Sequence, residues 1–137
     1  MARIISIDFG QKRCGIAVTD PLQIIATGLE VLPPEKVIPF LKEYTRINET
    51  ELILIGLPTN WDGSNTHATE PSQRMFERIK NAIPQIPVEQ IDERFTSQIA
   101  AREMHRMGMK KSERRKKENV DIIAATMMLQ EYLNNKG

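Results

Sequence analysis

The sequence is poor in the features that mark disulfide-rich, secreted or membrane-spanning proteins. Its single cysteine, Cys14, excludes an internal disulfide and fits a reducing compartment, so we expect it to be a small packing residue. No apolar run approaches the roughly 20 residues that a transmembrane helix needs, and no signal-peptide pattern opens the chain. The sequence therefore predicts a cytoplasmic protein with no membrane partner.

The chain also has little net charge and few aromatic residues. The formal net charge is +1, so any attraction for a polyanion must come from a local cluster of charges. Aromatic residues make up 5% of the chain and few lie near its basic residues, so stacking on nucleic-acid bases is not the evident mode of binding. Trp61 is the exception, and we favour a local packing role for it. A length of 137 residues with 40% apolar content predicts a single domain over residues 1–137.

The N-terminal stretch from Arg3 to Asp20 is the most informative part of the chain. Its apolar run, Ile4 to Ile7, is broken only by a serine and ends at Asp8, after which a glycine-containing turn leads to a second extended segment. This pattern predicts a strand–turn–strand hairpin. A carboxylate at the end of a buried strand costs free energy unless it is paired or binds a metal, although an ordinary turn role for Asp8 is the alternative.

The rest of the chain alternates between extended and helical patterns. We expect further strands over residues 22–32, 51–57 and 87–91, and helices over 35–47, 72–83, 98–107 and 119–133. Gly28 inside the third strand indicates a bulge. The first three strands can form an antiparallel meander, whereas the later two follow helical crossovers and should be parallel. The predicted fold class is α/β, with a mixed five-stranded sheet flanked by helices.

Acidic residues end two of the predicted strands and begin the last helix. Asp8 ends the first strand, Asp92 and Glu93 follow the fifth, and Asp121 precedes an apolar helix face that should lie against the sheet. We therefore expect Asp121 to point inward; the alternatives are a favourable helix-dipole contact for Asp121 and a solvated turn at Asp92 and Glu93. Carboxylates that converge at one end of a sheet repel one another unless a cation lies among them, and oxygen ligands select Mg²⁺ or Mn²⁺. Two such ions can promote phosphodiester hydrolysis.

A basic segment immediately precedes Asp121 and would flank this site. A run of charges is commonly just a solvated loop, but lysine and arginine beside a metal site suit a phosphate backbone. The predicted nucleic-acid contacts are Lys12, Arg13, Lys110, Lys111, Arg114, Arg115, Lys116 and Lys117. His67 and His105 have no partner at ligand spacing, so we expect ordinary polar roles for both.

Four segments of the chain carry a resemblance to a known family: IDFGQKRCGIAVTD, GLPTNWDGS, DERFTS and KKSERRKKENVDIIAA. In this order they resemble the YqgF-type (RuvX) family, whose members are described as Holliday-junction resolvases and as pre-16S rRNA processing nucleases. The resemblance implies a ribonuclease H-like fold. It also implies that Asp8, Glu93 and Asp121 are the catalytic ligands of Mg²⁺ or Mn²⁺, with Asp92 as the alternative to Glu93. It places at the rim of the site Gly56, Leu57, Pro58, Asn60, Asp62 and Gly63.

One departure from the family pattern is visible, because Thr96-Ser97 stands where the family often has two threonines; the hydroxyl is kept. The resulting hypothesis is a metal-dependent nuclease that processes the 5′ end of precursor 16S rRNA in ribosome biogenesis. The alternatives are a Holliday-junction resolvase acting on branched DNA and a non-catalytic RNA-binding assembly factor. A sugar-kinase-like phosphotransferase is disfavoured, because such enzymes need two domains around a cleft. The sequence leaves monomer and homodimer open, although a resolvase acting symmetrically on a junction should be a dimer.

Overall fold

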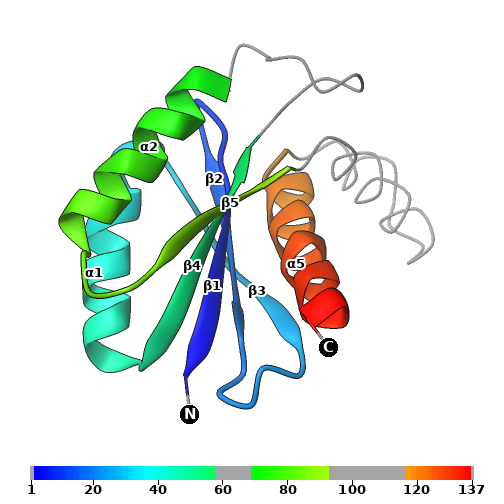
Figure 1. The fold of residues 1–137 in the computed structure, drawn as a ribbon. Coiled ribbons are helices and arrows are strands. Elements are labelled where there is room, and N and C mark those ends of the chain that lie inside the picture. The colour runs from blue at the N-terminus through cyan, green and yellow to red at the C-terminus, as the bar shows by residue number, and fades with distance from the viewer. Residues whose placement is uncertain (1, 58–68, 93–116, 137) are drawn as a thin grey trace.

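The computed structural model describes residues 2–57, 69–92 and 117–136, and these contain a sheet and the helices that cover it (Figure 1). The strands are β1 (Arg3–Asp8), β2 (Cys14–Thr19), β3 (Ala26–Leu32), β4 (Thr50–Leu57) and β5 (Val88–Asp92). The helices are the short 3₁₀ segment η1 (Pro34–Lys36), α1 (Val37–Ile47), α2 (Thr69–Ala82) and α5 (Lys117–Lys136).

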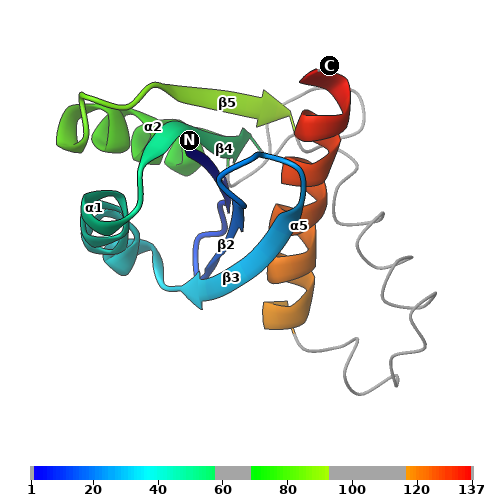
Figure 2. The same cartoon turned by 90° about the horizontal axis from the view of Figure 1, so that it is seen from below.

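The five strands form one mixed sheet in the order β3-β2-β1-β4-β5. β1, β2 and β3 pair antiparallel, whereas β4 pairs parallel to β1 and β5 pairs parallel to β4. Both parts of the predicted topology are therefore confirmed. Helices α1 and α2 cover one face of the sheet and α5 covers the other, as two views at right angles show (Figures 1 and 2).

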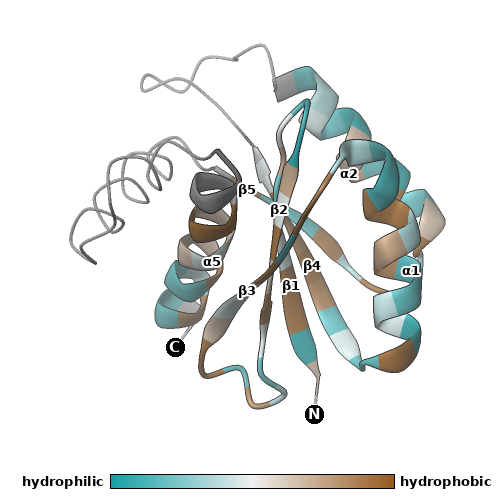
Figure 3. Cartoon of the chain, turned by 180° about the vertical axis from the view of Figure 1, so that it is seen from behind, coloured by the Kyte–Doolittle hydropathy of each residue, from teal (hydrophilic) through white to brown (hydrophobic). Residues whose placement is uncertain are grey.

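Each face of the sheet has its own hydrophobic core, because successive residues of a strand point to opposite faces. Ile5, Ile7 and Phe9 join the core under α1 and α2, whereas Ile4 joins the core under α5. β4 contributes to both cores, which explains its near-continuous apolar sequence. Hydrophobic residues accordingly follow the strands through the middle of the molecule (Figure 3).

The third strand begins at Ala26, so the prediction that it starts at residue 22 was wrong. The Asp20 carboxylate accepts hydrogen bonds from the backbone N–H groups of Ile24 (2.7 Å) and Ile25 (2.9 Å), and these bonds curl the chain into a turn. Leu22 and both isoleucines are left largely exposed. An apolar composition was misleading here because a local side-chain acceptor competes with the sheet for the backbone donors.

Other boundaries of the helices and strands differ by a few residues from those expected. α1 begins at Val37, and Pro39 lies in its first turn, where a missing N–H is tolerated. The predicted bulge is present beside Gly28: Ile16 pairs with Glu30 and the next residue of β2 pairs with Gly28, so one residue of β3 is extra. The helix expected over residues 98–107 lies outside the described residues. No helix in the described part of the chain is long and apolar enough to cross a membrane.

Candidate functional site

Asp8 is the last residue of β1, and it lies at the edge of the sheet where the parallel strands β1, β4 and β5 have their carboxyl ends. Its neighbours Ile7 and Phe9 are buried in the core under α1 and α2. Asp8 therefore shares the opposite face with Ser6 and lies toward α5, where it is half-buried. This position combines a fixed backbone with partial access to solvent, which suits a metal ligand.

The turn that follows Asp8 carries two basic residues, Lys12 and Arg13. A side chain at Gly10 would collide with the carbonyl oxygen of Arg13, so only glycine allows the chain to double back so tightly. The thiol of Cys14 lies 3.6 Å from the carbonyl oxygen of Gly10 and is fully buried in the core, as expected of a packing residue. Lys12 is exposed and Arg13 is partly exposed, so both cations can reach a ligand at this edge.

The parallel strands bring a second predicted acid position to the same edge. Ile7 of β1 lies level with Ile55 of β4, which in turn lies level with Gln90 of β5. Asp8 is one residue beyond this level and Asp92 is two residues beyond it, at the carboxyl ends of their strands. Two interstrand spacings separate the backbones of these strands by about 10 Å. The side chain of Asp92 and the whole of Glu93 lie outside the described residues.

Helix α5 brings the third predicted acid position to this edge. The Ser6 hydroxyl donates a 2.8 Å hydrogen bond to the carbonyl oxygen of Ala125, and both residues are fully buried. α5 runs antiparallel to β1, with its first turns beside the end of β1 (Figure 1). Position 121 is four residues, or about one turn, before Ala125, which places it about 6 Å nearer the edge. Asp8 is two residues beyond Ser6 in the same direction. The backbones of Asp8 and Asp121 therefore reach the same end of the sheet, although the Asp121 side chain is not among those described.

A pocket of about 360 Å³ opens beside this edge and contains two of the predicted nucleic-acid contacts. Its lining residues come from the β1–β2 turn, from the end of β3 and from α5: Lys12, Arg13, Val31, Leu32, Pro33 and Ile122. Two cations above an apolar floor form a surface that suits a phosphate chain with attached bases.

Several other predicted site residues fall outside the described part of the chain. These are Glu93, the basic residues Lys110, Lys111, Arg114, Arg115 and Lys116, the loop residues Pro58, Asn60, Asp62 and Gly63, and Trp61, His67, Thr96, Ser97 and His105. Lys117 begins α5, but its side chain is not described. Among the side chains that the structure describes, which do not include those of Asp92 and Asp121, no group of three or more acidic, histidine or cysteine residues is arranged to hold a metal ion.

Sequence reasoning overlooked two serines that hold the site's elements in place. Ser6 links β1 to α5, and the fully buried Ser72 donates a 2.9 Å hydrogen bond to the Gly56 carbonyl oxygen, which fixes α2 to the end of β4. Ser6 had left a signal, because it is the single polar residue within the isoleucine run of β1. Ser72 had none, since a serine near a helix start is ordinarily read as a cap.

A family model described as "RuvX: Holliday junction resolvase" matches residues 2–135. The chain belongs to the RuvX family. It is 44% identical to a candidate pre-16S rRNA nuclease of Flavobacterium psychrophilum over 99% of both chains. A candidate pre-16S rRNA nuclease of Bacteroides fragilis is 42% identical, also over 99% of both chains. The predicted family is thus confirmed, and with it the prediction of a nuclease.

Solved structures of low sequence identity share the fold. RuvC of Thermus thermophilus, in complex with a Holliday-junction substrate, aligns with a TM-score of 0.60 at 14% identity, covering 100% of this chain and 97% of that one. The fowlpox virus resolvase, bound to Holliday-junction DNA, aligns with a TM-score of 0.56 at 12% identity, covering 98% of both chains. The predicted ribonuclease H-like fold class is confirmed by these likenesses.

Proposed function

We propose that this protein is a metal-dependent nuclease that processes the 5′ end of precursor 16S rRNA. The observation that carries the proposal is the register of β1, β4, β5 and α5, which brings the positions of Asp8, Asp92 and Asp121 to one edge of the sheet. The pocket containing Lys12 and Arg13 adjoins that edge. The names of the two bacterial relatives support the choice of RNA as substrate.

The oxygen-rich donor set fits a hard divalent cation. Asp8, Glu93 and Asp121 would hold Mg²⁺ or Mn²⁺, because carboxylate oxygens are the ligands these ions prefer. When bound, the ion supplies Lewis-acid stabilisation of the charge that develops on the phosphate oxygens.

We favour Glu93 over Asp92 as the partner of Asp8, because side chains alternate between the two faces of the sheet along the described part of β5. Ile91 packs in the core under α5, which is the face that Asp8 shares. Glu89 pairs with Leu54, another residue of that core. Burial, and then the negative charge of Glu89, raise the pKa of Tyr132 on α5. Odd-numbered positions of β5 thus belong to the α5 side, and in a regular strand the next such position is 93.

The cations of the chain would bind and orient the substrate. Lys12 and Arg13 would contact phosphates on one side of the scissile bond, since Arg13 offers a planar fork of donors and Lys12 a mobile point charge. The basic residues 110–117 would extend this contact along the backbone.

Cleavage of four-way DNA junctions is the second candidate. Its support is the description of the family model and the fold shared with two junction resolvases. A junction has two symmetric cleavage sites, so this function predicts a homodimer in solution.

Cleavage assays with Asp8→Asn test both candidates. Wild type and variant are given a precursor 16S rRNA 5′ leader and a four-way junction, each with Mg²⁺ or Mn²⁺. We expect cleavage of the leader to fall in Asp8→Asn by more than the roughly 10- to 100-fold that loss of an outer-shell partner of a metal typically costs. Asp20→Asn is the matched control, because it also removes one carboxylate but at the end of β2 that lies away from the Asp8 turn. The cleavage rate of this variant should stay near that of wild type.

Each outcome of these assays separates the candidates. Junction cleavage that is lost in Asp8→Asn, with the leader left intact, would replace the RNA proposal by the resolvase. Equal activity in wild type and Asp8→Asn would refute the site assignment. Tight RNA binding without any cleavage by wild type would favour a non-catalytic assembly factor.

A further inference from the structure

A second pocket with two arginines lies at the same end of the molecule, on the other face of the sheet. It has a volume of about 340 Å³ and is lined by Phe9, Pro34, Pro71, Arg74, Met75 and Arg78. Phe9 directly follows Asp8, and α2 begins at this end of the sheet (Figure 1). None of the expected nucleic-acid contacts belongs to this pocket.

The two pockets are lined in part by neighbouring residues of the same two chain segments. Pro33 lines the pocket of Lys12 and Arg13, and Pro34 lines the second pocket. The β1–β2 turn also contributes to both, through Phe9 on one side and Lys12 on the other. Pro33 and Pro34 therefore link the linings of the two pockets along the chain.

The side chains of the second pocket suit an unpaired nucleotide. Arg74 and Arg78 are one helical turn apart and exposed, so both guanidinium groups can face the same phosphate chain. The other four lining residues are apolar, and Phe9 and Met75 among them are almost fully buried in the core, which makes the floor rigid. An apolar floor beneath two cations is suited to a base and its phosphate, whereas a duplex backbone would need the cations alone.

Acidic neighbours restrain Arg74 only weakly. Its guanidinium contacts the Glu70 carboxylate at 3.0 Å, but the two side chains are 62% and 82% exposed. An exposed ion pair of this kind contributes little, so Arg74 can exchange Glu70 for a phosphate. Glu77 and Glu70 lie with both arginines around a separate hollow on the outer side of α2.

We propose that Arg74 and Arg78 form a second nucleic-acid contact, which receives a single-stranded segment of the substrate that continues from the Lys12–Arg13 pocket across Pro33 and Pro34. This inference rests on the proposed nuclease function. The substrate is then held on both sides of the hairpin that carries Asp8. Single-stranded nucleotides on both sides of the cleavage point should be required for tight binding.

Binding measurements in the Asp8→Asn background test this contact without consuming the substrate. A single-stranded oligoribonucleotide of the precursor leader is titrated at several salt concentrations. The variant Arg74→Gln with Arg78→Gln should bind roughly tenfold more weakly. Its slope of log K against log salt should become shallower by about 1.4, because each lost phosphate contact on a single strand contributes about 0.7.

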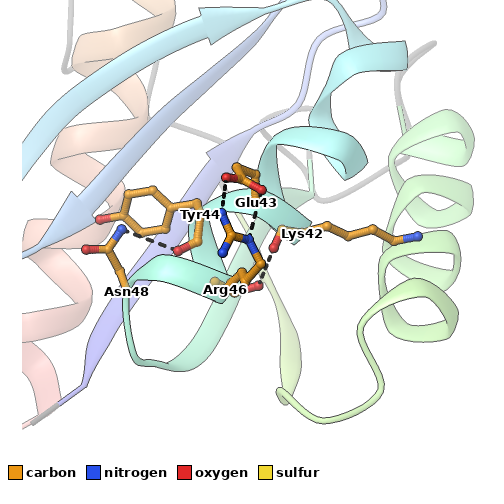
Figure 4. Close-up of polar contacts among 6 residues, drawn as sticks. Lys42, Glu43, Tyr44, Arg46 and Asn48 are labelled. Carbon is orange, nitrogen blue, oxygen red and sulfur yellow. Dashed lines mark hydrogen bonds and ion pairs between the residues drawn. The ribbon is translucent and has the colours of Figure 1, made fainter.

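A control with the same loss of charge comes from α1. Lys42 and Arg46 are exposed, and Arg46 contacts Glu43 through two hydrogen bonds of 2.5 and 3.1 Å, much as Arg74 contacts Glu70 (Figure 4). α1 ends just before β4 starts, at the edge opposite the site. The variant Lys42→Gln with Arg46→Gln should therefore keep the affinity and the salt slope of its Asp8→Asn parent.

Two further measurements test the role of Glu70 and the binding of a nucleotide base in the pocket. Glu70→Gln removes a competitor for Arg74 and should tighten binding two- to threefold, whereas a purely structural role for Arg74 predicts no gain. An abasic nucleotide scanned along the oligoribonucleotide should weaken binding at one or two positions only. A uniform effect along the strand would refute the single-base pocket.

The inference and the proposed function can fail separately. If wild type cleaves RNA but the Arg74/Arg78 variant binds like the α1 control, the second contact is refuted and the nuclease stands. If wild type does not cleave but the Arg74/Arg78 variant binds specifically more weakly, the nuclease is refuted and the contact stands. Absence of cleavage by wild type together with equal binding by the Arg74/Arg78 variant and its parent would overturn both.

Discussion

Replacing Gly28 by alanine would place a methyl group against α5, immediately beside the position of Asp121. The added Cβ would collide with Cγ2 of Ile122 and would lie 3.1 Å from Oγ1 of Thr126. That hydroxyl is itself held by a 2.8 Å hydrogen bond to the Ile122 carbonyl oxygen, so the helix surface here cannot yield easily. We expect α5 to move away from β3, which would displace Asp121 from Asp8.

The expected cost follows from the size of the clash. An extra methyl group in a packed interface typically costs about 1–3 kcal/mol. For a chain of 137 residues this corresponds to a fall of about 4–10 °C in melting temperature. Leader cleavage by Gly28→Ala should also fall at a temperature where the protein is still fully folded. Thr27→Ala, at an exposed neighbouring position of β3, is the control and should change both quantities much less.

Shortening Ile122 should relieve the clash. The added Cβ would lie 3.8 Å from Cβ of Ile122, an ordinary contact distance that alanine at position 122 would preserve. In a double-mutant cycle measured by urea unfolding, Gly28→Ala and Ile122→Ala should therefore be coupled by about 1–2 kcal/mol, with the double variant more stable than the sum of the single effects predicts. Additive effects would show that α5 does not pack on β3 as described, and would refute this reasoning.

Two further predictions concern stability. Ser6→Ala removes the buried donor to the Ala125 carbonyl oxygen and should lower the free energy of urea unfolding by about 1–3 kcal/mol; an unchanged value would mean that the contact does not tie β1 to α5. Hydrogen bonds from the backbone N–H of Ile25, and then of Ile24, lower the pKa of Asp20 below its ordinary value of 3.8. The stability that Asp20 contributes is therefore present above the unfolded-state pKa and lost as the pH falls through the lower folded-state pKa. Asp20→Ala should flatten the pH dependence of melting temperature below about pH 4, and a curve of unchanged shape would contradict this assignment.

Local sequence pattern was sufficient to predict much of the fold. The apolar runs of β1 and β4 and the Gly10 turn each reflect backbone geometry within a few residues, so the sequence was enough to predict five strands and which of them run antiparallel or parallel. The family motifs likewise named Asp8 and Asp121 as site positions. By contrast, the start of β3 was predicted wrongly, because the hydrogen bonds of Asp20 outweighed the apolar composition of residues 22–25.

The spatial relations within the site depended on the tertiary structure. Ser6 and Ala125 are separated by 119 positions in sequence, and only the docking of α5 on β1 makes their hydrogen bond. Arg74 and Arg78 read as surface residues of an amphipathic helix, until the packing of α2 beside Phe9 gives them a shared pocket. The sequence by itself determined which residue types end each strand, because alternation and turn chemistry are local. Which of them meet was decided by the sheet register and by the faces on which the helices pack, since those contacts join segments far apart in the chain.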